Sequence, residues 1–173
     1  MSKHLHTLHT ALDQLGDLVG RVSDSDLDKP TPCSDWTVAD LLDHTIWSVN
    51  GLAVATAGGQ PDFAADPPHV DDPAAAYAQA ADALRGAWEQ ADAAADARWN
   101  TAEVAVHGWD LAQALGVPSD QLDDAVAEDA LAFMSTALTS DKRGDAFAPE
   151  RDAPDGAGPY EQLVAFAGRE PIS

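Results

Sequence analysis

The stretch Thr101–Gly116, TAEVAVHGWDLAQALG, decides the fold, because it places a carboxylate and an imidazole four residues apart in an otherwise apolar helical pattern. On a helix, Glu103 and His107 would lie about 40° apart around the axis and roughly 6 Å apart along it. At that separation both side chains can reach one metal ion. Gly116, followed by Pro118, is typical of a helix end. The stretch therefore predicts a helix that carries two candidate metal ligands.

A third ligand has to come from another part of the chain, because a catalytic zinc usually takes three protein ligands and keeps one position open. The best candidate is His44 in DLLDHTIW, where an unpaired imidazole would be costly to bury among its apolar neighbours. A different interpretation stays open at this point. A Glu/His pair at this spacing is more often a solvated surface contact, and a single mid-helix histidine is more often a hydrogen-bonded core residue.

The rest of the chain also shows helical spacing of apolar residues. The pattern predicts further helices over about 2–22, 38–57, 73–95, 119–139 and 160–167. No strand alternation and no repeat of about 20 to 50 residues is visible. We therefore expect an all-α bundle. With 173 residues, the chain is long enough for one domain with a full core, so residues 1–173 are predicted to form a single domain.

The charge balance excludes several classes of partner. Nine Lys and Arg residues face 30 Asp and Glu residues, which gives a formal net charge of −21. Such a field repels phosphate backbones and anionic membranes, so neither nucleic acid nor a membrane is expected as a partner. No signal peptide and no apolar run of about 18 residues is present, and Cys33 is the only cysteine, so we expect a cytoplasmic protein. Exposed apolar helix faces would allow a homodimer.

Several other side chains invite a functional interpretation. His4, His6 and His9 are expected on the surface of the first helix, because nothing nearby completes a metal shell. Cys33 precedes the second helix, whose dipole could lower the pKa of a thiol, although a buried, inert thiol is the commoner case. Two tryptophans near His44 are expected to pack in the core. Acidic residues beside the candidate ligands could either support the imidazoles or be ordinary surface acids; these are Asp43 and Asp110.

Three blocks of sequence carry a resemblance to a known family. They are PTPCSDWTVADLLDH at 30–44, EVAVHGWDLAQALG at 103–116 and EQLVAFAGREP at 161–171. Together they resemble the DinB-like metal-binding families, specifically the N-terminal domain of the actinobacterial mycothiol-dependent maleylpyruvate isomerase. The resemblance covers nearly the full length, and three blocks in the same order are far more specific than one Glu/His pair.

The resemblance implies both a fold and a site. The implied fold is a DinB-like four-helix bundle in up-down-down-up order, here with an additional short helix at the C-terminus. The implied site holds a divalent metal through one histidine of the second helix and a glutamate and a histidine of a later one, which correspond here to His44, Glu103 and His107. Zinc is the expected metal, although nickel, iron or manganese also suits this ligand set. Mycothiol, a small thiol, is the implied cosubstrate.

This chain departs from the family in two respects. The segment EQADAAADARWNTA, which joins Trp88 to Glu103, is shorter than in relatives, and the further C-terminal domain of the isomerase is not in this sequence. We therefore expect a thiol-dependent S-transferase or isomerase acting on a small electrophile, with no catalytic or thiol-binding residues assigned. The alternatives are a metal-dependent hydrolase and a non-catalytic, stress-associated protein in which the ion ties two helices together.

Overall fold

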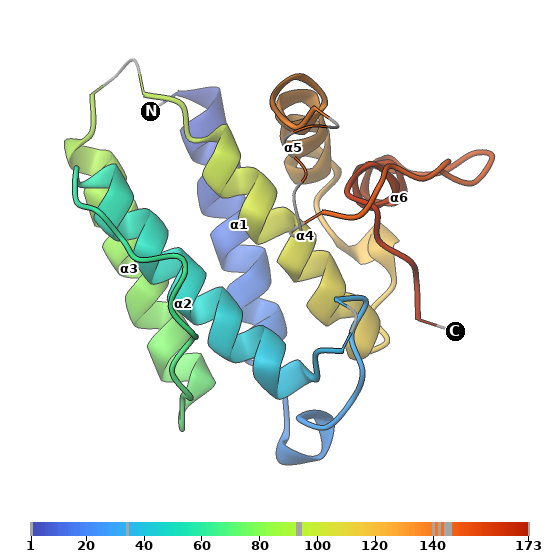
Figure 1. Ribbon diagram of the computed structural model, residues 1–173, viewed down its shortest axis with the longest axis horizontal. Helices are drawn as coiled ribbons and strands as arrows, with labels where there is room; N and C mark the ends of the chain where they lie inside the picture. Colours follow the sequence, from blue (N-terminus) through green and yellow to red (C-terminus); the bar gives the residue numbers. More distant parts are fainter. Residues whose placement is uncertain are drawn as a thin grey trace.

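Helix α4, Arg98–Ala114, lies at the centre of the computed structural model, and most of the other helices pack against it (Figure 1). The structure describes residues 2–33, 35–92, 95–139, 141, 143 and 147–172. Nearly every residue of α4 is buried, including its polar members Asn100, His107 and Asp110. A helix that is buried on all sides belongs in a core, as the apolar pattern of this stretch predicts.

The described residues form six α-helices and no strand, which confirms the all-α prediction. Four of these helices make the bundle: α1 (Lys3–Val19), α2 (Val38–Thr56), α3 (Pro73–Gln90) and α4. Figure 1 shows that α2 and α3 run in one direction and α1 and α4 in the other, which is the predicted up-down-down-up order. Helix α2 packs against α3, and α1 packs against α4. The fold is consistent with a DinB-like bundle.

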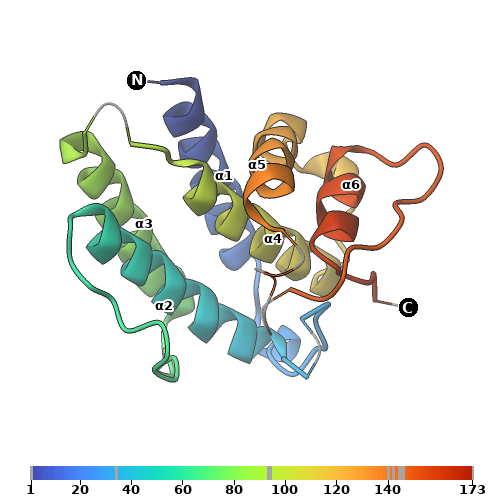
Figure 2. The same cartoon turned by 45° about the horizontal axis from the view of Figure 1, so that its top comes forward.

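Two helices follow the bundle. They are α5 (Asp124–Ala137) and α6 (Pro159–Phe166). The short 3-10 helices η1 (Asp24–Asp26) and η2 (Ser119–Gln121) lie before α2 and before α5. Helix α6 is the predicted C-terminal short helix. Figure 2 shows α5 and α6 beside each other, on the side of α1 and α4 away from α2 and α3. The core therefore extends beyond the four bundle helices.

Local chemistry fixes where most helices begin. Helix α2 starts at a capping box, in which the Thr37 amide donates to Asp40 Oδ2 at 2.9 Å and the Asp40 amide donates to Thr37 Oγ1 at 3.3 Å. Helix α3 starts after Asp72, whose carboxylate accepts from the Ala75 amide at 3.0 Å. These caps satisfy amide groups that the first helical turn leaves without intrahelical partners.

Several predicted helix boundaries differ from the structure. Helix α4 begins at Arg98, before the stretch from Thr101 that predicted it, and the Arg98 amide donates to Asp96 Oδ1 at 3.0 Å. The fifth helix begins only at Asp124, because Leu122 is extended and the Asp123 carboxylate accepts from the Ala125 amide at 2.9 Å. Helix α3 ends at Gln90 rather than near residue 95, although residues 93 and 94 lie outside the described part of the chain.

Candidate metal centre

The three predicted ligands converge where α2 packs against α4. His44 projects from α2, and Glu103 and His107 project from α4. Glu103 Oε1 lies 3.6 Å from His44 Nε2 and 3.3 Å from His107 Nε2. The two imidazole rings have centroids 4.9 Å apart. The structure thus brings together two ligands that helical spacing joins and one that only tertiary packing can add.

The distances between these atoms suit a shared ion. Two donors that each lie about 2.1 Å from a tetrahedral zinc are separated by about 3.4 Å. The observed separations from Glu103 Oε1 to the two Nε2 atoms, 3.6 and 3.3 Å, lie on either side of this value. One potential ligand atom from each of the three residues lies within 4.8 Å of the other two. The donor set therefore fits a divalent metal.

Ser48 adds a contact one turn after His44 on α2. Its hydroxyl donates to Glu103 Oε1 at 2.8 Å. Burial alone would raise the pKa of Glu103, but the charge of His107 and hydrogen bonds from both imidazoles and this hydroxyl hold that pKa well below its usual value. Glu103 is thus a carboxylate at neutral pH, which is the form that binds a metal.

His107 faces different surroundings through its other ring nitrogen. Nδ1 donates to Asp110 Oδ2 at 3.2 Å, and the side chain of Asp110 is fully buried. Burial would lower the pKa of His107, but the charge of Glu103 and the hydrogen bond to Asp110 raise it well above 6.5. A carboxylate in this position orients the ring so that Nε2 points toward Glu103.

Cys33 and Arg169 enclose Asp110. The Cys33 thiol donates to Asp110 Oδ2 at 2.8 Å, and Arg169 Nε lies 3.2 Å from Asp110 Oδ1. Burial raises the pKa of the Cys33 thiol, so the expectation of an inert thiol fits better than that of a helix-activated one. Sequence reasoning did not find Arg169, although it lies in the third block that carries the resemblance.

A second trio could also hold an ion by distance alone, namely Cys33, His107 and Asp110. The guanidinium of Arg169 contacts two of its members, with Nη2 3.3 Å from Cys33 Sγ and Nε 3.3 Å from Asp110 Oδ2. An added cation would have to displace this positive charge. The Nε2 side of His107 is therefore the favoured place for a metal.

A hollow of about 260 Å³ lies beside His44. Its lining comprises one candidate ligand, one tryptophan, one proline and three aspartates: His44, Trp36, Pro67, Asp35, Asp40 and Asp43. The side chains of His44 and Glu103 are 21% and 18% exposed, compared with 8% for His107. His44 is thus the candidate ligand that a small molecule in this hollow would contact.

Trp36 and Asp43, the neighbours of His44, make different contacts. Trp36 packs against the core but is only partly buried, and its ring also lies 4.6 Å from the His44 ring at the hollow. Asp43 accepts from the amide of Val70 at 2.9 Å and from His69 Nδ1 at 3.0 Å, so its carboxylate holds the segment before α3. Asp110, by contrast, does contact His107.

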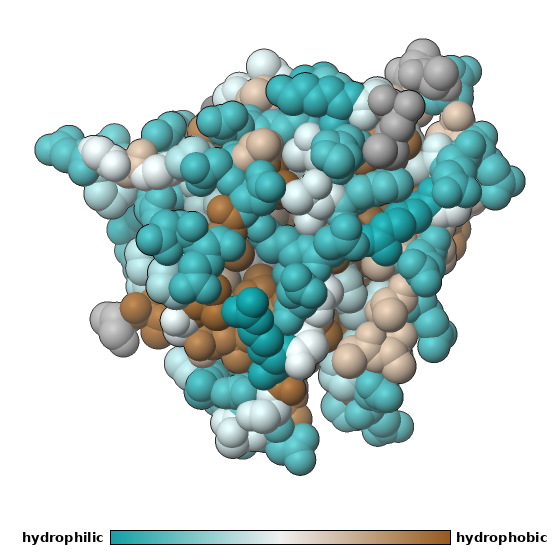
Figure 3. Space-filling model, turned by 180° about the vertical axis from the view of Figure 1, so that it is seen from behind, coloured by the Kyte–Doolittle hydropathy of each residue, from teal (hydrophilic) through white to brown (hydrophobic). Residues whose placement is uncertain are grey.

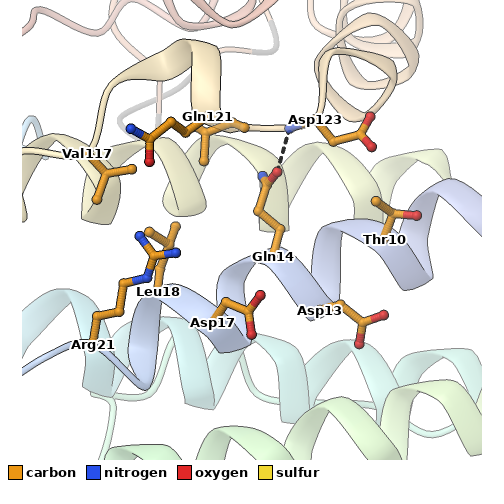
Figure 4. A pocket seen from close by; sticks show the side chains of 10 residues that line it. Thr10, Asp13, Gln14, Asp17, Leu18, Arg21, Val117, Gln121 and Asp123 are labelled. Atoms are coloured by element: carbon orange, nitrogen blue, oxygen red, sulfur yellow. Dashed lines mark hydrogen bonds between the residues drawn. The ribbon is translucent and has the colours of Figure 1, made fainter.

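A second hollow lies away from the candidate ligands, between α1 and the segment around η2 (Figure 4). Its volume is about 410 Å³, and polar side chains line much of it. The Gln14 amide in its wall already bonds within the protein, accepting from the Asp123 amide at 2.6 Å and donating to the Tyr160 hydroxyl at 2.7 Å. This arrangement holds helices together and offers no metal ligands comparable to those between α2 and α4.

The molecular surface carries the acidity seen in the sequence. Hydrophilic residues predominate on the face shown in Figure 3. Among the described residues, no helix is long and apolar enough to cross a membrane. Of the N-terminal histidines, His4 Nδ1 pairs with Asp129 at 2.7 Å, so its partner is a carboxylate of α5 and not a metal shell.

Two histidines and a carboxylate converge between two helices of the bundle. The protein is therefore a helical bundle with a candidate metal site. Residues 8–112 match the model of the family described as the mycothiol maleylpyruvate isomerase N-terminal domain, and the chain belongs to this family. All three candidate ligands lie within the matched residues. The resemblance inferred from the three blocks of sequence is thereby confirmed.

Two relatives span almost the whole chain. They are uncharacterized proteins from two strains of Mycobacterium tuberculosis, each 31% identical over 176 residues, covering 92% of this chain and 93% of the relative. Their similarity extends past residue 112 into the region of α5 and α6. No solved structure was found to match the chain.

Proposed function

We propose that this protein binds one divalent metal through His44, Glu103 and His107 and uses it with a small thiol, mycothiol, in an S-transferase or isomerase reaction. The observation that carries the proposal is the convergence of His44 Nε2 and His107 Nε2 on Glu103 Oε1, at 3.6 and 3.3 Å, with His44 also lining a surface hollow. The name of the family supports mycothiol as the thiol.

The bound metal would lower the pKa of a coordinating thiol and present it as a thiolate at neutral pH. The chain's own residues have positioning tasks. Ser48 holds Glu103 through its hydroxyl, and Asp110 holds His107 through Nδ1. Trp36 lies against His44 and shields that ring from water on one side. These contacts keep the three donors in place before the metal arrives.

Zinc is the proposed metal, with nickel, iron and manganese as the other candidates, because two imidazoles and one carboxylate accept any of them. The electrophile is a small molecule that fits the hollow of about 260 Å³. Three aspartates line this hollow, so a neutral or cationic electrophile is favoured over an anionic one.

We also propose that residues 1–173 function as a single domain. The family match ends at residue 112, but α5 packs against α4, and Arg169 reaches back to Asp110 beside His107. The segment after α6 thus contacts the neighbourhood of the candidate site, which supports treating the two parts as one unit.

Elemental analysis of the purified protein, followed by titration with mycothiol, tests the proposed function. We expect about one divalent ion per chain, and a change in the visible spectrum of the cobalt-substituted protein when mycothiol binds, as a thiolate ligand produces. A panel of electrophiles then identifies the reaction. Protein that holds no metal after exposure to zinc, cobalt and nickel would contradict the proposal.

The same measurements separate the alternatives. If the metal is present, thiol has no effect and esters or amides are cleaved, the ion activates water in a hydrolase. If the metal raises the melting temperature but neither thiol nor electrophile binds, the ion only ties α2 to α4. Either result would replace the thiol-dependent reaction.

A further inference from the structure

On the side of His107 away from Glu103, this residue and three other side chains form a buried polar cluster. Cys33 comes from the loop before α2, His107 and Asp110 come from α4, and Arg169 follows α6. The side chain of Asp110 is 0% exposed and that of Arg169 is 12% exposed. A buried ion pair is costly to form, so its retention beside a metal site calls for an explanation.

Asp110 is the acceptor at the centre of this cluster. Its Oδ2 accepts from His107 Nδ1 at 3.2 Å, from the Cys33 thiol at 2.8 Å and from Arg169 Nε at 3.3 Å. Arg169 Nε also lies 3.2 Å from Oδ1, and its Nη2 donates to Cys33 Sγ at 3.3 Å. The guanidinium therefore fixes both the carboxylate and the thiol that contact it.

The backbone after α6 delivers Arg169 to this point. Gly168 adopts a positive φ of 79°, and a Cβ at this position would lie 2.5 Å from the Ala148 carbonyl oxygen, so the turn requires glycine. The Arg169 amide then donates to the Val164 carbonyl at 2.9 Å, which closes the end of the helix. The position of the guanidinium is set by this turn and not by a mobile tail.

We propose that Arg169 is a positioning residue of the metal centre: it holds the Asp110 carboxylate against His107 Nδ1 and thereby directs the Nε2 lone pair toward the ion. This inference rests on the proposed function. It adds that a residue outside the matched region 8–112 tunes the affinity of a site whose three ligands all lie within it. A carboxylate that is itself hydrogen-bonded is the usual outer support of a metal-bound imidazole.

A purely electrostatic role for Arg169 makes the opposite prediction. If the guanidinium only neutralised Asp110, its removal would leave an unpaired negative charge near the ion and would tighten metal binding. If it positions Asp110, its removal lets the carboxylate turn away from Nδ1, and metal binding weakens. The sign of the change in affinity therefore distinguishes the two roles.

The test compares zinc affinity, measured by competition with a chromophoric chelator, for the full-length wild type, Arg169→Gln, Arg169→Lys and Arg151→Gln. Arg169→Gln should bind zinc about ten- to a hundredfold more weakly. Arg169→Lys keeps the buried charge but cannot grip both carboxylate oxygens, so an intermediate loss is expected. Arg151, which is exposed and pairs with Glu170, is the matched control, and its replacement should leave the affinity unchanged.

Nuclear magnetic resonance of the zinc-loaded protein gives a second readout that a merely structural role would not change. The Nδ1 proton of His107 should be protected from exchange with water in the wild type and should exchange faster in Arg169→Lys, which retains the charge needed for folding. Unchanged or tighter zinc binding in both Arg169 variants would overturn the inference while leaving the proposed metal site intact. Failure of the wild type to bind zinc would instead overturn both.

Discussion

The two ring nitrogens of His107 face regions of opposite character. Nε2 faces Glu103 and His44, whose side chains are 18% and 21% exposed, and His44 also lines a hollow in the surface. Nδ1 lies against Asp110 in a closed cluster that Arg169 completes. The open side allows ligands to be exchanged, and the closed side prevents the ring from turning. His107 thus connects the candidate metal site to the buried cluster of Asp110 and Arg169, which holds the imidazole ring in its orientation.

The largest expected effect comes from removing the residue that both sides share. His107→Ala should reduce the bound metal from about one ion per chain to almost none, because two remaining ligands rarely retain zinc against dilution. Metal content after gel filtration measures this loss. His69→Ala is the matched control, since His69 is 73% exposed and contacts Asp43 rather than the candidate ligands. Retention of the ion by the His107 variant would reject the ligand assignment.

The next prediction concerns pH and the metal-free protein. The pKa of His107 is raised above its usual 6.5, so its stabilising contribution is complete below that pH and is lost as pH rises through the raised value. The pKa of Glu103 lies well below its usual 4.5, so its contribution is lost only as pH falls through that lowered value. Stability of the metal-free protein should therefore decline above pH 6.5, with a limiting slope of about 1.4 kcal/mol per pH unit.

Urea unfolding at a series of pH values, with and without zinc, measures this dependence. Zinc should reverse the trend, because the ion replaces the proton on His107 and the stabilisation by metal grows as pH rises. The His107→Ala variant, which lacks the charged pair, should show a flatter profile. A metal-free wild type that became more stable as the pH rises above 6.5 would contradict the charged pair.

A smaller effect is expected on the closed side, at Cys33. Burial raises the pKa of this thiol, so its alkylation in the folded protein should be about tenfold slower for each unit of elevation than in the urea-unfolded chain. Mass spectrometry after timed exposure to iodoacetamide gives both rates. Equal rates in the two states would show that the thiol is accessible and that the cluster behind His107 is not closed.

The smallest expected effect is on the open side, at Ser48. Its hydroxyl donates to Glu103 Oε1 at 2.8 Å, and Ser48→Ala removes one hydrogen bond to a charged group. The metal affinity should fall by about 1 to 2 kcal/mol, or roughly five- to thirtyfold. Ser135→Ala, on an exposed part of α5, serves as the control. If the Ser48 variant binds zinc as tightly as the wild type, the imidazoles alone hold Glu103 in place.

Local rules explain which parts of the site were predictable. Glu103 and His107 were recognisable because a spacing of four residues on a helix fixes their relative position before any packing is known. The start of α2 at Thr37 follows from its capping box, for the same local reason. Ser48 was within reach of this reasoning, because it lies one turn after His44 on the same face of α2.

Other parts of the site have no local signal. Trp36 is a large apolar residue of a type expected in a core. Only the path of the loop before α2 places its ring beside His44 at the hollow. Arg169 is separated from Asp110 by 59 residues, and no periodicity relates the two. Asp43 is adjacent in sequence to His44, but consecutive side chains on a helix point in different directions. The Asp43 carboxylate therefore pairs with His69 and does not support the His44 ring.

The sequence alone determined that the chain is helical, that it is strongly acidic, and that a carboxylate and an imidazole share one face of the central helix, because each of these properties depends on composition or on spacing within one segment. Tertiary structure decided that His44 meets them across the α2–α4 contact and that Arg169 closes the cluster behind His107. These are encounters between distant segments, and their distances depend on how whole helices pack.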